Sequence, residues 1–150
     1  MMEDFHVSFK VNASAREAFK AILSVKEWWT DSLVGETQNE GDEFSVQFWD
    51  VHYSKHKIIE IIPDKKIVWF TTESQLNFVG NKQEWNGTKI VFDISTENGQ
   101  TIVGFTHIGL LPKIECYKDC SNAWGEYIGS LKSLIESGKG NPSLKFRMFR

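Results

Sequence analysis

The sequence predicts an α+β domain in which a curved antiparallel sheet of about six strands wraps around one long C-terminal helix. Three patterns lead to this fold class. An alternating segment and two short helical patterns open the chain, period-two alternation runs from Glu43 to Ile108, and a helical period spans Tyr117 to Ser137. A sheet must bury one face, and a long amphipathic helix can cover it. Because a straight helix does not follow a curved sheet along its whole length, we expect a cavity between them.

The first strand and the first helices follow from local patterns. The segment Phe5 to Val11, "FHVSFKV", alternates between apolar and polar residues and predicts a strand. In "SAREAFKAIL", Ser14 and Glu17 have the spacing of a capping box, so a helix is expected to begin there. The same pairing returns at Ser24 and Glu27, which predicts a break near Ser24 and a second short helix.

Two adjacent tryptophans lie in this second helix. Side chains of neighbouring helical residues point about 100° apart, because one turn holds about 3.6 residues. We therefore expect that Trp28 and Trp29 are not both fully buried in one place and that one of them lies at the mouth of a pocket.

The middle of the chain predicts successive antiparallel strands joined by hairpins. The strand segments are "EFSVQFW", "SKHKIIEII", "KKIVWFTT", "TKIVFDIS" and "TIVGFTHI". Pro63-Asp64 signals a turn, and Asn98-Gly99 is a strong hairpin signal between the last two segments. The stretch from Ser74 to Gly87 shows no clear period, so it either extends strands or forms a loop over a pocket.

The last helix carries a row of small residues beside its apolar side. Ser121, Gly125 and Gly129 recur every fourth residue. Each interior glycine lowers helix stability by about 1 kcal/mol relative to alanine. We expect a compensation, either the close approach of another element or room for a ligand beside Trp124 and Ile128.

Length, charge and cysteine content narrow the class of protein. The 150 residues fit one domain, residues 1–150, with residues 141–150 expected to form a flexible tail. The net charge of −3 gives no reason to expect nucleic acid or an anionic membrane as a partner. The acidic N-terminus lacks the order of a signal peptide, and no apolar run is long enough to span a membrane. Two cysteines favour the reducing cytoplasm as location.

His107, Cys116 and Cys120 lie close together in the sequence and raise the question of a metal site. A structural zinc needs four ligands, and no fourth residue has a matching spacing, so no metal is expected. A disulfide is not expected either, because helical side chains four residues apart tilt in the same direction. The two cysteines are interpreted as small buried residues of the last helix.

The order of elements and several short motifs resemble the START-like (SRPBCC) superfamily with its helix-grip fold. The motifs are "WW" at 28–29, "GDEF" at 41–44, "VW" at 68–69, "EWNGTKIVF" at 84–92 and the combination "FTHIGLLP…ECY…CSNAWGEYIGSLKSLIESGKG". Within the superfamily the chain is similar to homologues of the heat-shock protein 90 ATPase activator and to polyketide cyclase-like proteins. Members of this fold bind sterols, lipids, polyketides, plant hormones or flavonoids, act as enzymes, or modulate a chaperone, so the fold alone does not decide the function.

The resemblance and the high aromatic content favour a domain that binds a small hydrophobic or aromatic molecule between the sheet and the last helix. The expected ligand classes are lipids, sterols, polyketides and flavonoids, and no cofactor is expected. His107 would orient the ligand. The residues expected to line the cavity are Trp28, Trp29, Phe44, Val46, Phe48, Trp69, Phe92, Phe105, His107, Trp124 and Ile128.

Two other functions stay open from the sequence. An enzyme of the cyclase or hydratase type would use His107 as a general acid or base. A histidine at a strand end more often has a structural hydrogen-bond partner, and no catalytic partner residue is evident, so catalysis is not the expected function. Regulation of a chaperone ATPase is the third function, and it follows only from the resemblance.

Overall fold

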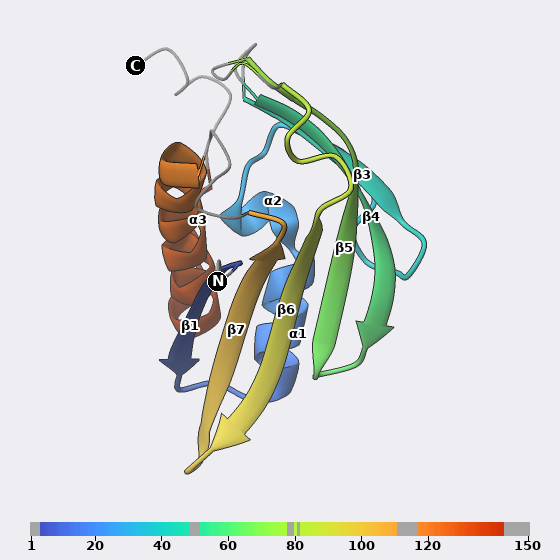
Figure 1. Ribbon diagram of the computed structural model, residues 1–150. Helices are drawn as coiled ribbons and strands as arrows, with labels where there is room; N and C mark the ends of the chain where they lie inside the picture. Colours follow the sequence, from blue (N-terminus) through green and yellow to red (C-terminus); the bar gives the residue numbers. More distant parts are fainter. Residues whose placement is uncertain (1–3, 49–51, 78–79, 81, 111–116, 143–150) are drawn as a thin grey trace.

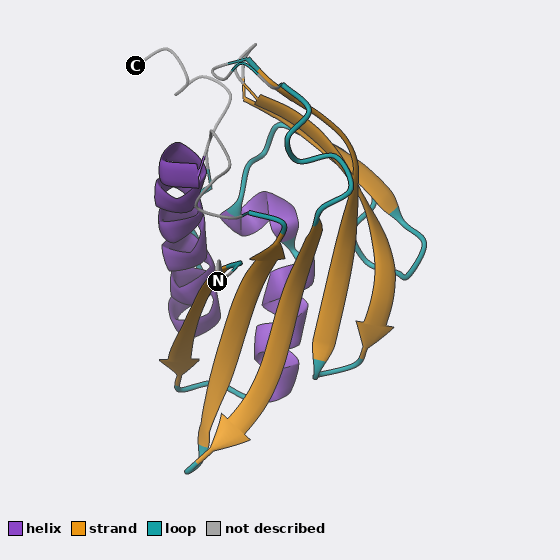
Figure 2. Cartoon of the chain, viewed as in Figure 1, coloured by secondary structure: helices purple, strands orange, loops and turns teal. Residues whose placement is uncertain are grey.

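The computed structural model describes residues 4–48, 52–77, 80, 82–110 and 117–142. Within these residues, seven strands form one antiparallel sheet in the order β1-β7-β6-β5-β4-β3-β2, and three helices lie on its concave face (Figure 1 and Figure 2). The strands are β1 (Phe5–Val11), β2 (Leu33–Gly35), β3 (Glu43–Phe48), β4 (His52–Ile62), β5 (Lys66–Leu76), β6 (Lys89–Glu97) and β7 (Gln100–Ile108). The helices are α1 (Ala15–Leu23), α2 (Val25–Trp28) and α3 (Tyr117–Ser137). The predicted fold class is confirmed.

The strand that the sequence patterns do not reveal is β2. It has three residues, which is too short for a visible period, and it pairs with β3 through Leu33 opposite Val46. Its position makes it one edge of the sheet, with Val34 75% exposed. The expected flexible tail, residues 141–150, lies outside the described residues from position 143 onward.

The first helix begins as its sequence predicts. The Ser14 hydroxyl accepts a hydrogen bond from the Glu17 amide at 3.0 Å, and the Glu17 carboxylate accepts one from the Ser14 amide at 3.0 Å. The predicted break at Ser24 is also present, but the second capping box is not. Ser24 donates its hydroxyl back to the Lys20 carbonyl at 3.1 Å, so it ends α1 and makes no side-chain cap for α2.

The predicted turns join the long strands. Pro63-Asp64 separates β4 from β5. Asn98 and Gly99 both have positive φ angles, 51° and 79°, and Glu97 pairs with Gln100 across them. This is the two-residue hairpin that an Asn-Gly pair favours, because its twist matches that of the strands.

Three stacked tryptophans form the centre of the core. The ring centroids of Trp28, Trp29 and Trp69 lie 5.9–6.3 Å apart with interplanar angles of 7–13°. Trp28 and Trp29 are both 0% exposed, so the expectation that one of them lies at a pocket mouth is wrong. The physical reason is that α2 is a single turn ending at Trp28, between the sheet and α3, so both of its sides are covered.

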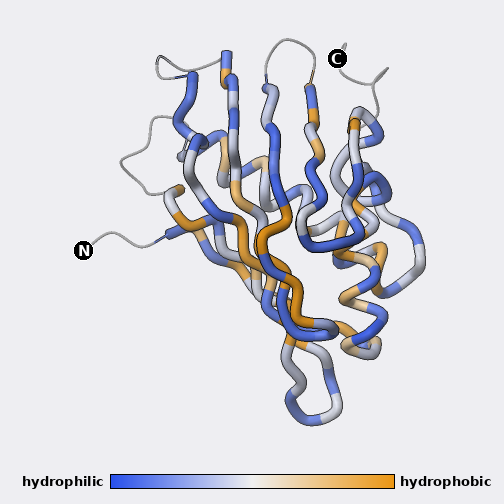
Figure 3. Tube along the Cα trace, turned by 90° about the vertical axis from the view of Figure 1, so that its right-hand side faces the viewer, coloured by the Kyte–Doolittle hydropathy of each residue, from blue (hydrophilic) through white to orange (hydrophobic). Residues whose placement is uncertain are grey.

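The long helix presents its apolar side to the sheet, and hydrophobic residues recur among hydrophilic ones along its trace (Figure 3). Its buried residues are Cys120, Trp124, Ile128, Ser130, Leu131, Leu134 and Ile135. Gly125 and Gly129 lie on the exposed side, and apart from the chain neighbours and the backbone of the helix itself no described atom lies within 4 Å of a Cβ built on either. Within the described structure, neither close packing nor a ligand space compensates for these two glycines.

Replacing either helical glycine by alanine is expected to stabilise the protein. Gly125→Ala and Gly129→Ala each remove backbone freedom from the unfolded chain without a steric cost, and each should raise the free energy of unfolding by about 0.5–1 kcal/mol in urea titrations. Gly35→Ala is the matched control, because Gly35 has a φ of +116° and a Cβ there would collide with the Glu43 carbonyl oxygen. Destabilisation by the helical substitutions would mean that this side of α3 is packed against another part of the chain.

Candidate functional site

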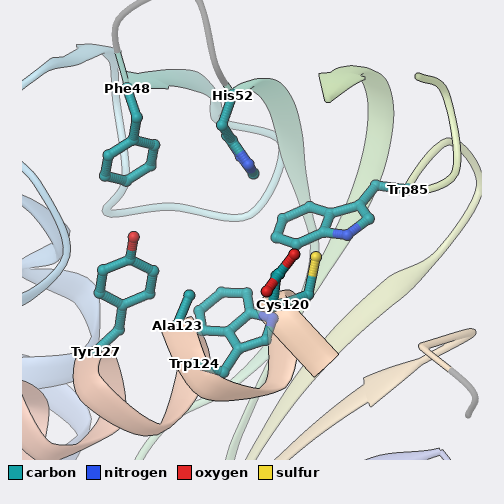
Figure 4. Close-up of a pocket in the computed structure, with 8 residues that line it drawn as sticks. Phe48, His52, Trp85, Cys120, Ala123, Trp124 and Tyr127 are labelled. Carbon is teal, nitrogen blue, oxygen red and sulfur yellow. The ribbon is translucent and has the colours of Figure 1, made fainter. Parts of the chain in front are cut away.

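A pocket of about 270 Å³ lies beside the first half of α3, where the helix faces the ends of β3 and β4. Most of its wall is aromatic, and the labelled rings converge on a common space (Figure 4). Its lining residues are Phe48, His52, Trp85, Asp119, Cys120, Ala123, Trp124 and Tyr127.

The helix contributes five of the eight lining residues, and four of these follow its periodicity. Cys120, Ala123, Trp124 and Tyr127 are spaced as i, i+3, i+4 and i+7, which places them on one side of a helix. Tyr127 stacks on Phe48 of β3, with ring centroids 5.8 Å apart and an interplanar angle of 18°. This pair closes one end of the pocket.

The opposite wall comes from the turn that precedes β6. Trp85 is buried there, and its ring stacks on Trp124 with centroids 5.8 Å apart and an interplanar angle of 9°. The Thr88 hydroxyl and the Thr88 amide both donate to the Trp85 carbonyl, at 2.7 and 3.0 Å, and these bonds hold the turn. Of the stretch from Ser74 to Gly87, the residues up to Leu76 therefore extend β5, and Trp85 supplies a pocket wall.

The structure places the sequence-predicted site residues in two groups. Phe48 and Trp124 line the pocket. The other nine are at most 5% exposed and belong to the packed core. They are Trp28, Trp29, Phe44, Val46, Trp69, Phe92, Phe105, His107 and Ile128. Most of the space that the sequence suggests for a ligand is thus filled by the protein's own rings, and the pocket is the part at one end that stays open.

His107 is fully engaged inside the protein. The indole nitrogen of Trp124 donates to Nδ1 of His107 at 3.1 Å, so the imidazole proton resides on Nε2. Nε2 in turn donates to the Thr88 hydroxyl at 2.9 Å. Burial lowers the pKa of His107 to about 3. The ring is neutral, both of its nitrogens have hydrogen-bond partners, and it is not part of the pocket wall. His107 therefore holds Trp124 and Thr88 in position and is not poised for proton transfer near pH 7.

A second chain of polar side chains starts at the pocket and runs into the core. Nε2 of His52 lies 2.9 Å from the Ser54 hydroxyl, which lies 2.8 Å from Nε2 of His56. Nδ1 of His56 lies 3.0 Å from the Thr71 hydroxyl. Burial lowers the pKa of His52 to about 3 and, together with the nearby His52 and His107, holds the pKa of His56 well below 6.5. Both rings are therefore neutral at physiological pH.

The cysteines differ from their sequence interpretation. Cys120 is buried and disulfide-bonded, which contradicts the expectation that no disulfide forms. The other cysteine of the chain, Cys116, lies outside the described residues. The expectation assumes that both cysteines lie in one helix. The described helix starts at Tyr117, so only Cys120 is known to lie in it. Among the described residues, no group of three His, Cys, Asp or Glu side chains is placed to hold a metal ion.

Comparison with known families decides the assignment of the chain. The family model described as Activator of Hsp90 ATPase homolog 1-like protein matches residues 12–136. The chain belongs to this family. The resemblance to the START-like superfamily is thereby confirmed. Among curated proteins, none matches the chain at a significant level.

Solved structures share the architecture. The solution structure of the Aha1 dimer from Colwellia psychrerythraea is 26% identical in sequence, with a TM-score of 0.74 over 93% of this chain and 100% of that chain. DynU16, from the dynemicin biosynthetic locus, is 15% identical, with a TM-score of 0.66 over 92% of this chain and 49% of that chain. CalU16 from Micromonospora echinospora is 13% identical, with a TM-score of 0.66 over 91% and 78%. At the two lower identities the likeness concerns the fold alone.

No helix within the described residues is both long and apolar enough to cross a membrane.

The buried histidines predict a stability that falls in acid. In the unfolded chain a histidine takes up a proton near pH 6.5, whereas folded His107 does so only near pH 3. Between these values each such group lowers the free energy of unfolding by about 1.4 kcal/mol per pH unit as the pH falls. Urea titrations from pH 7 to pH 4 should therefore show a shallower pH slope for His107→Gln than for the unsubstituted protein. Equal slopes would contradict the buried, neutral state of His107.

Proposed function

We propose that this domain binds a small, uncharged aromatic molecule in the pocket between α3 and the ends of β3 and β4. The observation that carries the proposal is that an aromatic-walled pocket persists at this end although nine of the residues expected to line a cavity are buried in the core. Ligand sites are typically concave and mostly apolar, with a few polar groups that orient the ligand. The polar groups of this wall include the imidazole of His52, the carboxylate of Asp119 and the hydroxyl of Tyr127.

The size of the pocket narrows the ligand class. Its volume of about 270 Å³ lies just below the range of about 300–1,000 Å³ that is typical of drug-sized ligands. A cavity of about 150 Å³ accommodates benzene. A molecule of one or two aromatic rings therefore fits, and among the classes expected from the sequence, small polyketide or flavonoid fragments suit the pocket better than a sterol or a long acyl chain.

The wall composition supports an aromatic ligand in particular. Trp85 and Trp124 stack on each other, and Phe48 and Tyr127 form a second stacked pair. Aromatic pairs contribute about 0.5–1.5 kcal/mol beyond the burial of their area when they are offset-stacked or edge-to-face. A planar ligand can form such pairs with either side of the pocket.

Filling the pocket from the helix is expected to abolish binding. Ala123 lies on the pocket side of α3 and is only half-buried, so Ala123→Phe should occupy the space without disturbing the core. In calorimetric titrations with a panel of one- and two-ring aromatic compounds, the affinity should fall at least about tenfold, which corresponds to a loss of about 1.4 kcal/mol.

The neighbouring Asn122→Phe is the matched control. Asn122 is exposed and is not among the residues that line the pocket, so the same ring added there should leave the affinity unchanged. An equal loss in both variants, or no binding by any compound to the unsubstituted protein, would contradict the proposal.

A second candidate function is regulation of an Hsp90-type chaperone. It is supported by the family of the chain and by the similarity to the Aha1 dimer. The test is the ATPase rate of a purified Hsp90-type chaperone with and without saturating amounts of the protein. An increase that Ala123→Phe retains would support a regulatory surface separate from the pocket, and an unchanged rate would contradict regulation. Catalysis by His107 is not proposed, because both of its ring nitrogens already have partners.

A further inference from the structure

Four polar side chains form one hydrogen-bonded row from the pocket to the inside of the sheet, and we call this row the relay. Its members, in order from the pocket, are His52, Ser54, His56 and Thr71. Ser54, His56 and Thr71 are 0% exposed, so water does not complete their hydrogen bonding. The inference below rests on the proposed function and specifies the ligand of the same pocket.

The pocket end of the relay is an open ring nitrogen. Nε2 of His52 is bound to Ser54, and Nδ1 of His52 has no hydrogen-bond partner among the described residues. Unlike the indole nitrogens of Trp29 and Trp85, which are sealed without a partner, Nδ1 of His52 is not enclosed. His52 belongs to the pocket wall, and its ring points into the pocket (Figure 4). A ligand in the pocket can therefore reach it.

The relay can be hydrogen-bonded in two directions, and each neutral imidazole contributes one proton in both. In the first direction, His52 donates from Nε2 to Ser54, whose hydroxyl donates to Nε2 of His56. The proton of His56 then resides on Nδ1 and points at the Thr71 oxygen. Nδ1 of His52 is left as an acceptor toward the pocket.

In the second direction every bond is reversed. The Thr71 hydroxyl donates to Nδ1 of His56, Nε2 of His56 donates to Ser54, and the Ser54 hydroxyl donates to Nε2 of His52. The proton of His52 then resides on Nδ1 and points toward the pocket.

The buried end of the relay distinguishes the two directions. The only partner that the described structure gives the Thr71 hydroxyl is Nδ1 of His56. In the first direction that nitrogen carries a proton, so the hydroxyl proton of Thr71 has no acceptor. In the second direction the hydroxyl proton is used, and the one relay proton without an acceptor among the described residues is that on Nδ1 of His52, which faces the pocket rather than the buried core. A buried donor without an acceptor is costly, so the second direction is favoured.

We infer that the relay presents the Nδ1 proton of His52 to the pocket, and that the ligand is a one- or two-ring aromatic molecule carrying an uncharged hydrogen-bond acceptor such as a ketone oxygen. A phenol oxygen can accept this bond as well, but the phenol proton then needs an acceptor of its own, which a ketone does not. Among the described lining residues an anion finds no cationic side chain, and the one charged residue there is Asp119. A neutral carbonyl group satisfies His52 at the lowest cost of desolvation.

The first test is the position of the protons in the unliganded protein. Long-range ¹H–¹⁵N correlation spectra of histidine-labelled protein distinguish a protonated ring nitrogen from an unprotonated one. The spectra should show the proton of His52 on Nδ1 and the proton of His56 on Nε2. His107, whose Nδ1 accepts from Trp124, is the internal reference with its proton on Nε2. A proton on Nε2 of His52 would overturn the inference.

The second test compares two ligands of nearly equal shape. 1-Indanone carries a ketone oxygen, and 1-methylideneindane has a CH₂ group in its place. NMR titrations should show that 1-indanone binds about tenfold more tightly, as expected for one buried hydrogen bond. Thr71→Val removes the group that sets the direction, so the preference should shrink several-fold, whereas Thr71→Ser keeps the hydroxyl and should keep the preference.

The outcomes separate this inference from the proposed function. Equal affinities for the two compounds in the unsubstituted protein would overturn the inference and leave the pocket as a ligand site. The inference is also overturned if Thr71→Val remains folded and retains the full preference. Absence of binding by both compounds overturns it too, and the proposed function then depends on the outcome for the wider aromatic panel.

Discussion

The pocket depends on one buried hydrogen bond, from the indole nitrogen of Trp124 to Nδ1 of His107. This bond joins α3 to β7, and His107 continues through Thr88 to the carbonyl of Trp85. Because Trp85 and Trp124 stack on each other, the same chain holds both rings at a defined angle to the pocket. Polar contacts thus join α3, β7 and the turn before β6. All partners in these contacts are buried, and in a buried environment such bonds are strong and their loss is costly.

The location of the pocket follows from how the core is filled. The stacked rings of Trp28, Trp29 and Trp69 occupy the space between the sheet and the helices near its middle. Trp29 lies 5.0 Å from Trp124, centroid to centroid, and so marks the boundary between the filled core and the open end. Close packing leaves no room for a ligand among these rings. A pocket remains between the first turns of α3 and the ends of β3 and β4.

Sequence patterns predict the architecture because each element carries a local signal. The capping box at Ser14 and the Asn98-Gly99 hairpin are examples, and β2 escapes because three residues show no period. The site is harder to predict. Trp124 is found from the helical period, and the same period extends to Ala123 and Tyr127. Trp85 and His52 have no such signal, because one lies in an aperiodic turn and the other is brought to the pocket only by the pairing of β4. Nor does sequence distinguish a ring that fills the core from a ring that lines a pocket, since both need the same aromatic residues.

The most direct test of the central claim is the detection of contacts between a bound aromatic molecule and the tryptophan rings. Intermolecular nuclear Overhauser effects from bound 1-indanone can be assigned to individual indoles by single Trp→Phe substitutions. We expect effects to Trp85 and Trp124 and none to Trp28 or Trp69, because the latter two rings lie in the packed core. Contacts to Trp28 or Trp69 without contacts to Trp85 and Trp124 would contradict it.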